Sequence, residues 1–174
     1  MRKHCLCLSF ILISAASQLS AETNPLKVCV WQDDEGYDAF RLARQLASRK
    51  LDSGASLALV VITGKVLGIK EEQRLADPAT PFARVVQKEQ TAKARSAEVE
   101  RLGCDYAIMV WYHEGAGRFD QTSVGYKLRK AGSKKVLAGA SAPPFTVFVR
   151  QGRWVFDPYL LFANQIVKKL NSLP

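Results

Sequence analysis

Histidine is scarce in this sequence, and its scarcity excludes the commonest enzyme sites. The 174-residue chain has two histidines. His4 lies in a segment that we expect to be cleaved off, which leaves His113 as the one imidazole for acid-base work. No serine sits in a Gly-x-Ser-x-Gly elbow, so a hydrolase of that type is not indicated. A Cys104–His113 pair is excluded as well, because nine extended residues separate them by roughly 30 Å.

Metal ligands and phosphate-binding loops are missing too. One histidine and two separated cysteines fall short of the usual zinc clusters. His113 and Glu114 are neighbours on a predicted strand end, where adjacent side chains point to opposite faces. Neither a Gly-x-Gly-x-x-Gly sequence nor a phosphate loop is present. We therefore expect no enzyme, with no catalytic residue, no metal site and no cofactor.

One acidic run needs a separate interpretation. Asp33, Asp34 and Glu35 follow the first predicted strand, and α/β proteins often bind ligands at the carboxyl ends of their strands. The same residues also stand where a helix begins, and carboxylates are good helix caps. We interpret the run as helix capping.

Long hydrophobic runs are absent except at the amino terminus. Met1–His4 is positively charged, and Cys5–Ala16 is apolar over about a dozen residues, short of the ~20 that span a bilayer as a helix. Small residues follow, with Ser20-Ala21 before Glu22 as the preferred cleavage point. Cysteines occur only at the start of this run, which does not fit a lipid anchor. The sequence predicts a signal peptide over residues 1–21 and one domain over 22–174, periplasmic or secreted.

Acidic residues are nearly absent from the last third of the chain. Residues 121–174 carry nine basic side chains and a single acidic one, Asp157, whereas residues 22–120 are almost neutral. Five of the basic residues cluster around one predicted hairpin: Lys127, Arg129, Lys130, Lys134 and Lys135. The cluster is either a basic face for an envelope protein or anionic envelope component, or a set of solvated lysines. Tyr126 is the only aromatic residue close to this cluster in the sequence. One aromatic side chain is too few for a surface that stacks nucleic-acid bases.

Cysteine is sparse, with four residues in the whole chain. Cleavage of the signal peptide would leave only Cys29 and Cys104. Export to an oxidising compartment favours a disulfide between them. Both also lie in apolar, strand-like surroundings, where a free cysteine behaves as a small hydrophobic residue. Both interpretations stay open at this stage.

Apolar periodicity predicts an α/β domain with a mixed sheet, parallel at its start and antiparallel at its end, and with packed helices. Strands are expected at Leu26–Trp31, Leu57–Ile62 and Tyr106–Trp111, with hairpins over Val124–Ala140 and Phe145–Phe156. Helices are expected from Asp38 to Leu51, over Phe82–Leu102 with a break in the middle, and after Asp157-Pro158, with Leu161, Phe162, Ile166, Val167 and Leu170 on the apolar face.

One short motif carries a resemblance. Leu102-Gly103-Cys104-Asp105-Tyr106 enters a strand and resembles the bacterial envelope domain shared by the TolB amino terminus and the periplasmic part of the curli secretion channel. The later hairpin and final helix follow the same order as in that family. The chain departs from it at Cys104, where the family has alanine, at the added hairpin over 145–156, and in its acidic first loop. The resemblance implies a non-enzymatic envelope domain that works through protein contacts.

The added hairpin supplies the candidate contact surface. Its aromatic and arginine side chains are of the kind enriched at interface hot spots: Phe145, Phe148, Arg150, Arg153 and Trp154. Alternatively, Phe148 and Trp154 complete the core beneath the last helix. The sequence thus favours an exported binding or assembly module, and a small exported hydrolase of unrecognised type is the alternative.

Overall fold

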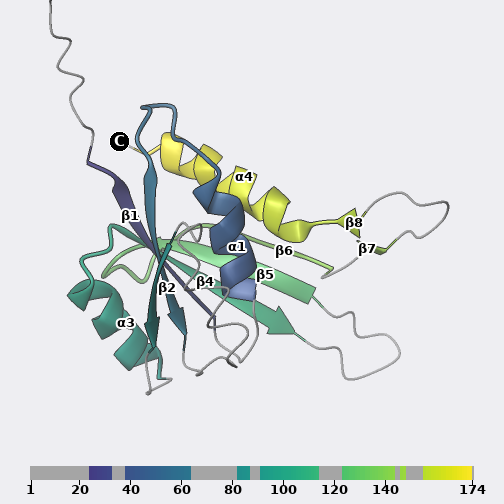
Figure 1. Ribbon diagram of the computed structural model, residues 1–174. Coiled ribbons are helices and arrows are strands. Elements are labelled where there is room, and N and C mark those ends of the chain that lie inside the picture. Colours follow the sequence, from purple (N-terminus) through teal and green to yellow (C-terminus); the bar gives the residue numbers. More distant parts are fainter. Residues whose placement is uncertain are drawn as a thin grey trace, which may run out of the picture.

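Six strands form one mixed sheet in the computed structural model of the chain (Figure 1). The structure describes residues 24–32, 38–63, 82–86, 91–113, 123–143, 146–147 and 155–173. In chain order the elements are β1 Leu26–Gln32, α1 Asp38–Ala47, β2 Leu57–Thr63, β3 Phe82–Val86, α3 Ala92–Arg101, β4 Tyr106–His113, β5 Ser123–Lys130, β6 Val136–Ala142, β7 Thr146–Val147, β8 Val155–Phe156 and α4 Pro158–Asn171.

The sheet has the predicted mixture of strand directions. Its strand order is β3-β2-β1-β4-β5-β6. The first four strands in this order are parallel, whereas β5 and β6 run antiparallel to their neighbours. β1 and β2 are apolar on both faces, as strands covered from both sides must be. The predicted α/β class is confirmed.

One predicted helix is partly wrong. The sequence pattern predicts a helix with a break over residues 82–102, but Phe82–Val86 is strand β3, which pairs in parallel with β2. The helix begins only at Ala92, after Thr91 as N-cap, whose side chain accepts a hydrogen bond from the Ala94 amide at 3.1 Å. The sequence after Thr91 is rich in Ala, Lys and Glu, so the whole of residues 82–102 resembles a helix. The short segment before it contains β-branched valines, and pairing with a neighbouring strand holds it extended.

In the described part of the chain, α1 and α4 lie over one face of the sheet and α3 lies over the other (Figure 1). α1 and α4 pack over the face that carries Val28, Val30, Ile108 and Tyr126, and this side holds the larger core. Phe162 on α4 is fully buried there, with its ring centroid 5.1 Å from that of Tyr126.

Both of these helices differ slightly from the sequence prediction. α1 ends at Ala47 rather than at Leu51, because the chain turns back early: Leu51 donates its amide to the Ala55 carbonyl at 3.1 Å, and Lys50 forms a bridge with Ser56. On α4, Leu161 is 38% exposed, whereas the apolar pattern places it in the core. The N-cap Asp157 accepts from the Tyr159 amide at 2.9 Å, as predicted.

The opposite face of the sheet carries a smaller core beneath α3. Cys29, Trp31, Val60 and Ile62 gather there with Val99 of the helix. The structure joins Cys29 to Cys104 in a disulfide, with their Cα atoms 5.9 Å apart. The interpretation of these cysteines as unbridged hydrophobic residues is therefore not the one that the structure adopts.

Candidate functional site

The motif at residues 102–106 builds a joint between β1 and β4 rather than a binding site. Gly103 adopts φ +63°, which ends α3 in a left-handed turn that glycine enters without strain. The Asp105 amide then donates to the Lys27 carbonyl at 2.8 Å, and the Asp105 carboxylate accepts from the Lys27 amide at the same distance. The Lys27 ammonium completes the joint by donating to the Leu102 carbonyl at 2.6 Å. These residues therefore fix the start of two central strands.

The predicted basic cluster does not form a single patch. Side chains alternate between faces along β5, so Lys127 and Arg129 share one face while Lys130 lies on the other. Lys134 and Lys135 are exposed in the connection to β6. That end of the hairpin lies near α3, because a Cβ built on Gly132 would be 3.6 Å from Glu100 Oε1. Lys127 and Arg129 are therefore the two cations of the predicted cluster that share one face of β5.

Trp111 shares this face with the two cations. In the β4–β5 ladder Trp111 is opposite Gly125, and Met109 is opposite Lys127. A Cβ built on Gly125 would lie 2.2 Å from Trp111 Cζ2 and 2.7 Å from the Ala140 carbonyl oxygen. The indole ring therefore lies across β5 and occupies the space that a side chain at position 125 would need.

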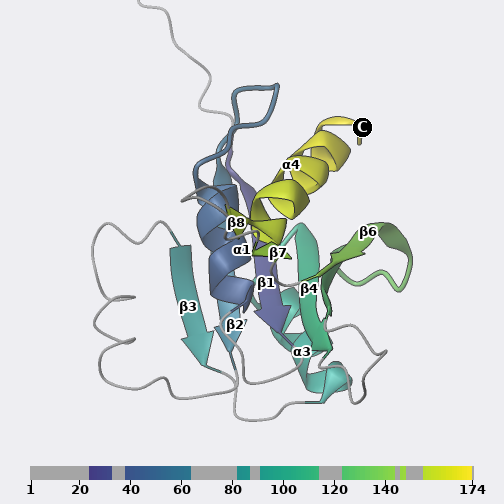
Figure 2. The same cartoon turned by 90° about the vertical axis from the view of Figure 1, so that its right-hand side faces the viewer.

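We call Met109, Trp111, Lys127 and Arg129 the Trp111 face. Lys127 is exposed and the other three side chains are partly exposed. Their partners in the β5–β6 ladder are Gly139 for Lys127 and Val136 for Arg129, neither of which is acidic. The Arg129 Nε is buried and has no hydrogen-bond partner in the part of the chain that the structure describes. α1 and α4 cover the other side of the sheet (Figures 1 and 2), whereas α3 is on the side of the Trp111 face and lies near the turn between β5 and β6.

The Trp111 face has the chemistry of a protein-binding surface. Tryptophan, methionine and arginine are enriched at interfaces, and truncation of tryptophan or arginine there is often costly. Two cations without an acidic neighbour in the strand ladder favour an acidic partner. Sequence reasoning identifies Lys127 and Arg129 but misses Trp111, because its position depends on a cross-strand glycine 14 residues further along the chain.

The other predicted contact residues lie outside the described part of the chain. This holds for the side chains of Phe145, Phe148, Arg150, Arg153 and Trp154, and for Asp33 and Asp34. The structure does pair β7 with β8 in antiparallel fashion, with Thr146 opposite Phe156. The predicted hairpin therefore exists in its backbone pairing, while its role in binding stays a prediction.

A buried polar cluster joins α1 to α4 near the carboxyl end of β1. The Gln32 side-chain oxygen accepts from the amides of Asp38 and Ala39, at 2.8 and 3.1 Å, and so caps α1. The Tyr159 hydroxyl donates to the Asp38 carboxylate. Burial, together with this hydrogen bond, raises the pKa of Tyr159. Tyr159 is only 3% exposed, and its hydrogen bond to Asp38 fastens α4 to α1.

The described residues contain neither a cluster of metal ligands nor a helix suited to cross a membrane. Over the ranges given above, no three His, Cys, Asp or Glu side chains gather in a way that would hold a metal ion. No helix in that part of the chain combines the length and apolar character needed to span a membrane.

Comparison with known proteins returns only distant structural neighbours. No protein-family model matches the chain, and no curated protein matches it. Solved structures include the lipoprotein GNA1162 from Neisseria meningitidis, 13% identical with a TM-score of 0.36, over 86% of this chain and all of that one. A PelC dodecamer from Paraburkholderia phytofirmans is 15% identical with a TM-score of 0.33, over 86% of this chain and 88% of that one. The resemblance to the TolB and curli-channel domain stays a prediction.

Proposed function

We propose that this protein is an exported, non-enzymatic envelope module that binds an acidic surface of another envelope protein through the Trp111 face. The observation that carries the proposal is the placement of Trp111 across Gly125, beside Lys127 and Arg129 on one side of the sheet. A rigid aromatic ring held on a strand loses little conformational freedom on binding. The two cations add attraction and orientation for a negatively charged partner.

The charge distribution supports the same proposal. Nine of the basic side chains lie in residues 121–174, which contain the single acid Asp157. Asp157 itself is occupied, because its carboxylate caps α4 and accepts from the Gln45 side chain at 3.0 Å. On the Trp111 face, neither Lys127 nor Arg129 has an acidic cross-strand partner in the β4–β5–β6 ladder. Such an excess speeds encounter with an acidic partner and makes binding weaken as salt is added.

Site-specific photo-crosslinking in the envelope fraction tests the proposal. A benzophenone side chain at position 127 is expected to give one discrete protein adduct, whereas the same probe at exposed position 50, in the loop after α1, is expected to give none. Lys127→Glu should reduce affinity for that partner by about tenfold. The variant should fold normally, because an exposed side chain without an ion pair contributes within about 0.5 kcal/mol to stability.

Lys50→Glu is the matched control, since it makes the same charge change elsewhere on the surface. Equal loss of binding in both variants would show a nonspecific effect of net charge and would contradict the proposal. Adducts with lipid or polysaccharide alone would show that the Trp111 face binds an anionic envelope component and not a protein.

A further inference from the structure

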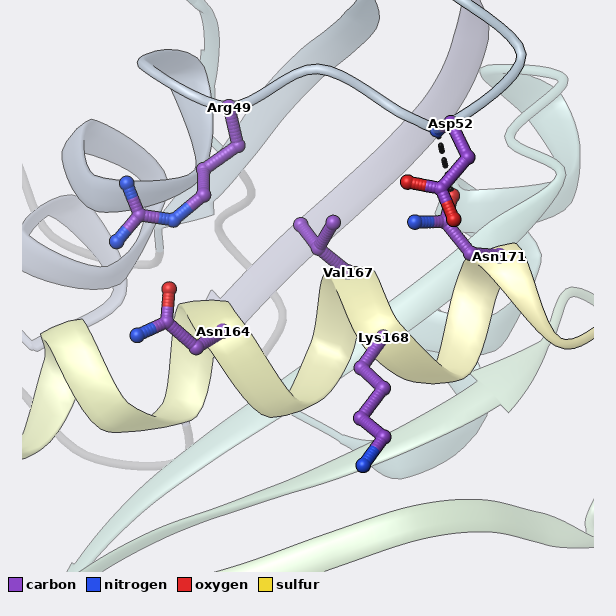
Figure 3. Close-up of a pocket in the computed structure, with 6 residues that line it drawn as sticks. All are labelled: Arg49, Asp52, Asn164, Val167, Lys168 and Asn171. Carbon is purple, nitrogen blue, oxygen red and sulfur yellow. Dashed lines mark hydrogen bonds between the residues drawn. The ribbon is translucent and has the colours of Figure 1, made fainter.

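A polar pocket of about 310 Å³ lies between the loop after α1 and the outer surface of α4 (Figure 3). It lies on the side of the sheet that α1 and α4 cover, opposite the Trp111 face. An inference from this pocket is therefore independent of the proposed function. Arg49 and Asp52 come from the loop, and α4 contributes the other lining residues: Asn164, Val167, Lys168 and Asn171. The pocket volume is at the lower end of the ~300–1,000 Å³ typical of small-molecule sites.

Defined contacts shape the two walls of the pocket. The α4 residues recur at intervals of three and four, so they form one stripe along the helix. The loop is joined to this helix at one end of the pocket, because the Asp52 amide donates to the Asn171 side-chain oxygen at 3.1 Å. The Gly54 amide donates to the Leu51 carbonyl at 2.8 Å and closes the loop on itself. The pocket is therefore formed before any ligand binds.

One end of the pocket is suited to an oxyanion. The Arg49 guanidinium faces the Asn164 carboxamide from the opposite wall (Figure 3). Among the described residues, Arg49 Nε is buried without a hydrogen-bond partner, and the Arg49 guanidinium donates a long 3.4 Å hydrogen bond to the Ser48 hydroxyl. Among the residues that the structure describes, neither Arg49 nor Lys168 has an acidic partner. An arginine with unused donors is a good partner for a carboxylate, which it can bind through two parallel hydrogen bonds.

The rest of the pocket is suited to hydroxyl groups on a short carbon frame. Asp52 and Asn171 lie together at the far end, and Val167 lies between the two ends (Figure 3). Carboxylate and carboxamide oxygens accept hydrogen bonds from hydroxyls, and the carboxamide nitrogen donates them. Val167 offers an apolar surface for carbon atoms.

We propose that this pocket binds a small polyhydroxylated carboxylate of the sugar-acid class, with its carboxylate on Arg49 and Asn164 and its hydroxyls toward Asp52 and Asn171. The pocket is open to solvent on one side, so a free sugar acid and the terminal residue of an acidic glycan present the same chemistry to it. Lys168 also lines the pocket, and its ammonium points away from Arg49 and Asp52 (Figure 3).

Titration of the isotope-labelled protein with D-glucuronate, followed by amide NMR, tests the proposal. Saturable shifts are expected around residues 49, 164 and 171, and D-glucose is expected to bind at least about tenfold more weakly because it lacks the charge. Arg49→Gln should weaken glucuronate binding by a similar factor. Asn164→Asp should abolish binding, because its carboxylate would occupy the guanidinium in place of the ligand. Both changes are at positions with little hydrogen bonding to lose, and unchanged melting temperatures would show this.

Lys93→Gln is the matched control, since it removes one exposed positive charge on α3, on the opposite side of the sheet from the pocket. The proposal is overturned if glucuronate gives no saturable shifts, if glucose binds equally well, or if Lys93→Gln weakens binding as much as Arg49→Gln. Comparison of trigalacturonate with galacturonate separates the two sources: tighter binding of the trimer assigns the pocket to a glycan end, and equal binding assigns it to the free acid.

Discussion

A side chain at position 125 and the present position of Trp111 exclude one another. A Cβ at this position would lie 2.2 Å from the indole and 2.7 Å from the Ala140 carbonyl oxygen, far below contact distance for a carbon atom. Gly125→Ala should therefore displace Trp111 and destabilise the fold by about 1–3 kcal/mol, as overpacking commonly does. Urea unfolding measures the loss, and the tryptophan fluorescence spectrum of the folded protein reports the movement of the ring.

Ser141→Ala provides the control for this change. Ser141 is the β6 partner of Gly125 and is exposed, so a similarly small change there should alter stability by no more than about 0.5 kcal/mol. If Gly125→Ala leaves both stability and fluorescence unchanged, the indole does not lie across β5, and the surface proposed for partner binding loses its central residue.

Tyr159 is the residue that should make stability depend on alkaline pH. Burial and the hydrogen bond to Asp38 raise the pKa of its hydroxyl in the folded state. An unfolded tyrosine ionises near pH ~10. The folded protein then holds a proton that the unfolded chain releases, so this contribution is complete below about pH 10 and is lost as pH rises further. Burial raises the pKa of Tyr126 as well, in the same direction.

Tyr159→Phe separates the hydroxyl from the ring. The variant should lose about 1–3 kcal/mol at neutral pH, because the charged hydrogen bond to Asp38 disappears. Its stability should also decline less steeply than that of the parent protein between about pH 9 and 11. Urea unfolding across this range measures both effects, with exposed Tyr112→Phe as the control. Parallel pH curves for Tyr159→Phe and the parent would show that the hydroxyl is not held in its neutral form.

At the scale of elements, the disulfide and the motif beside it tie α3 and β4 to β1. Cys29 and Cys104 are 75 residues apart, and a closed loop of that length restricts the unfolded chain by about 4 kcal/mol. Reduction should therefore lower the free energy of unfolding by roughly that amount. Denaturant unfolding with and without reductant measures it. The unfolding of the double variant Cys29→Ala, Cys104→Ala should not change when reductant is added. If reductant destabilises this variant as much as the parent protein, the effect does not come from the disulfide.

The elements that can be predicted from the sequence are those with a strong local pattern. Leu57–Thr63 is apolar throughout, and Asp157-Pro158 is a clear helix start, so both are recognisable. Phe82–Val86 escapes prediction because its strand character depends on pairing with β2. Leu161 is misplaced because α4 turns a narrower face to the core than its apolar residues suggest.

The candidate sites are less predictable than the fold, for the same physical reason. Lys127 and Arg129 can be found from charge alone. Trp111 over Gly125, and Arg49 opposite Asn164, are juxtapositions of residues from different elements, and no local pattern encodes them. Sites that depend on tertiary contacts become visible only when strand register and helix packing are known.

At the scale of the whole molecule, the two proposed sites lie on opposite sides of the sheet. The polar pocket lies between α4 and the loop after α1, and the Trp111 face is on the side of α3 (Figure 1). A partner on one side therefore leaves the other side free. Binding of D-glucuronate should then leave the crosslinking yield at position 127 unchanged, because ligands at separate sites affect each other only through a coupling free energy. A changed yield at saturating glucuronate would show that the two sides are coupled through the sheet.

Export gives the last prediction, because it links the amino terminus to the disulfide. The predicted signal peptide carries Cys5 and Cys7, so cleavage before Glu22 leaves Cys29 and Cys104 as the only thiols in the chain. An oxidising compartment then has a single pairing available, which is the one in the structure. The intact mass of the exported protein should match residues 22–174 less two hydrogens. The same residues produced in a reducing cytoplasm should retain both hydrogens and unfold at lower denaturant concentration. An exported product that still carries Met1 would contradict the signal peptide, and one with free thiols would contradict the proposed compartment.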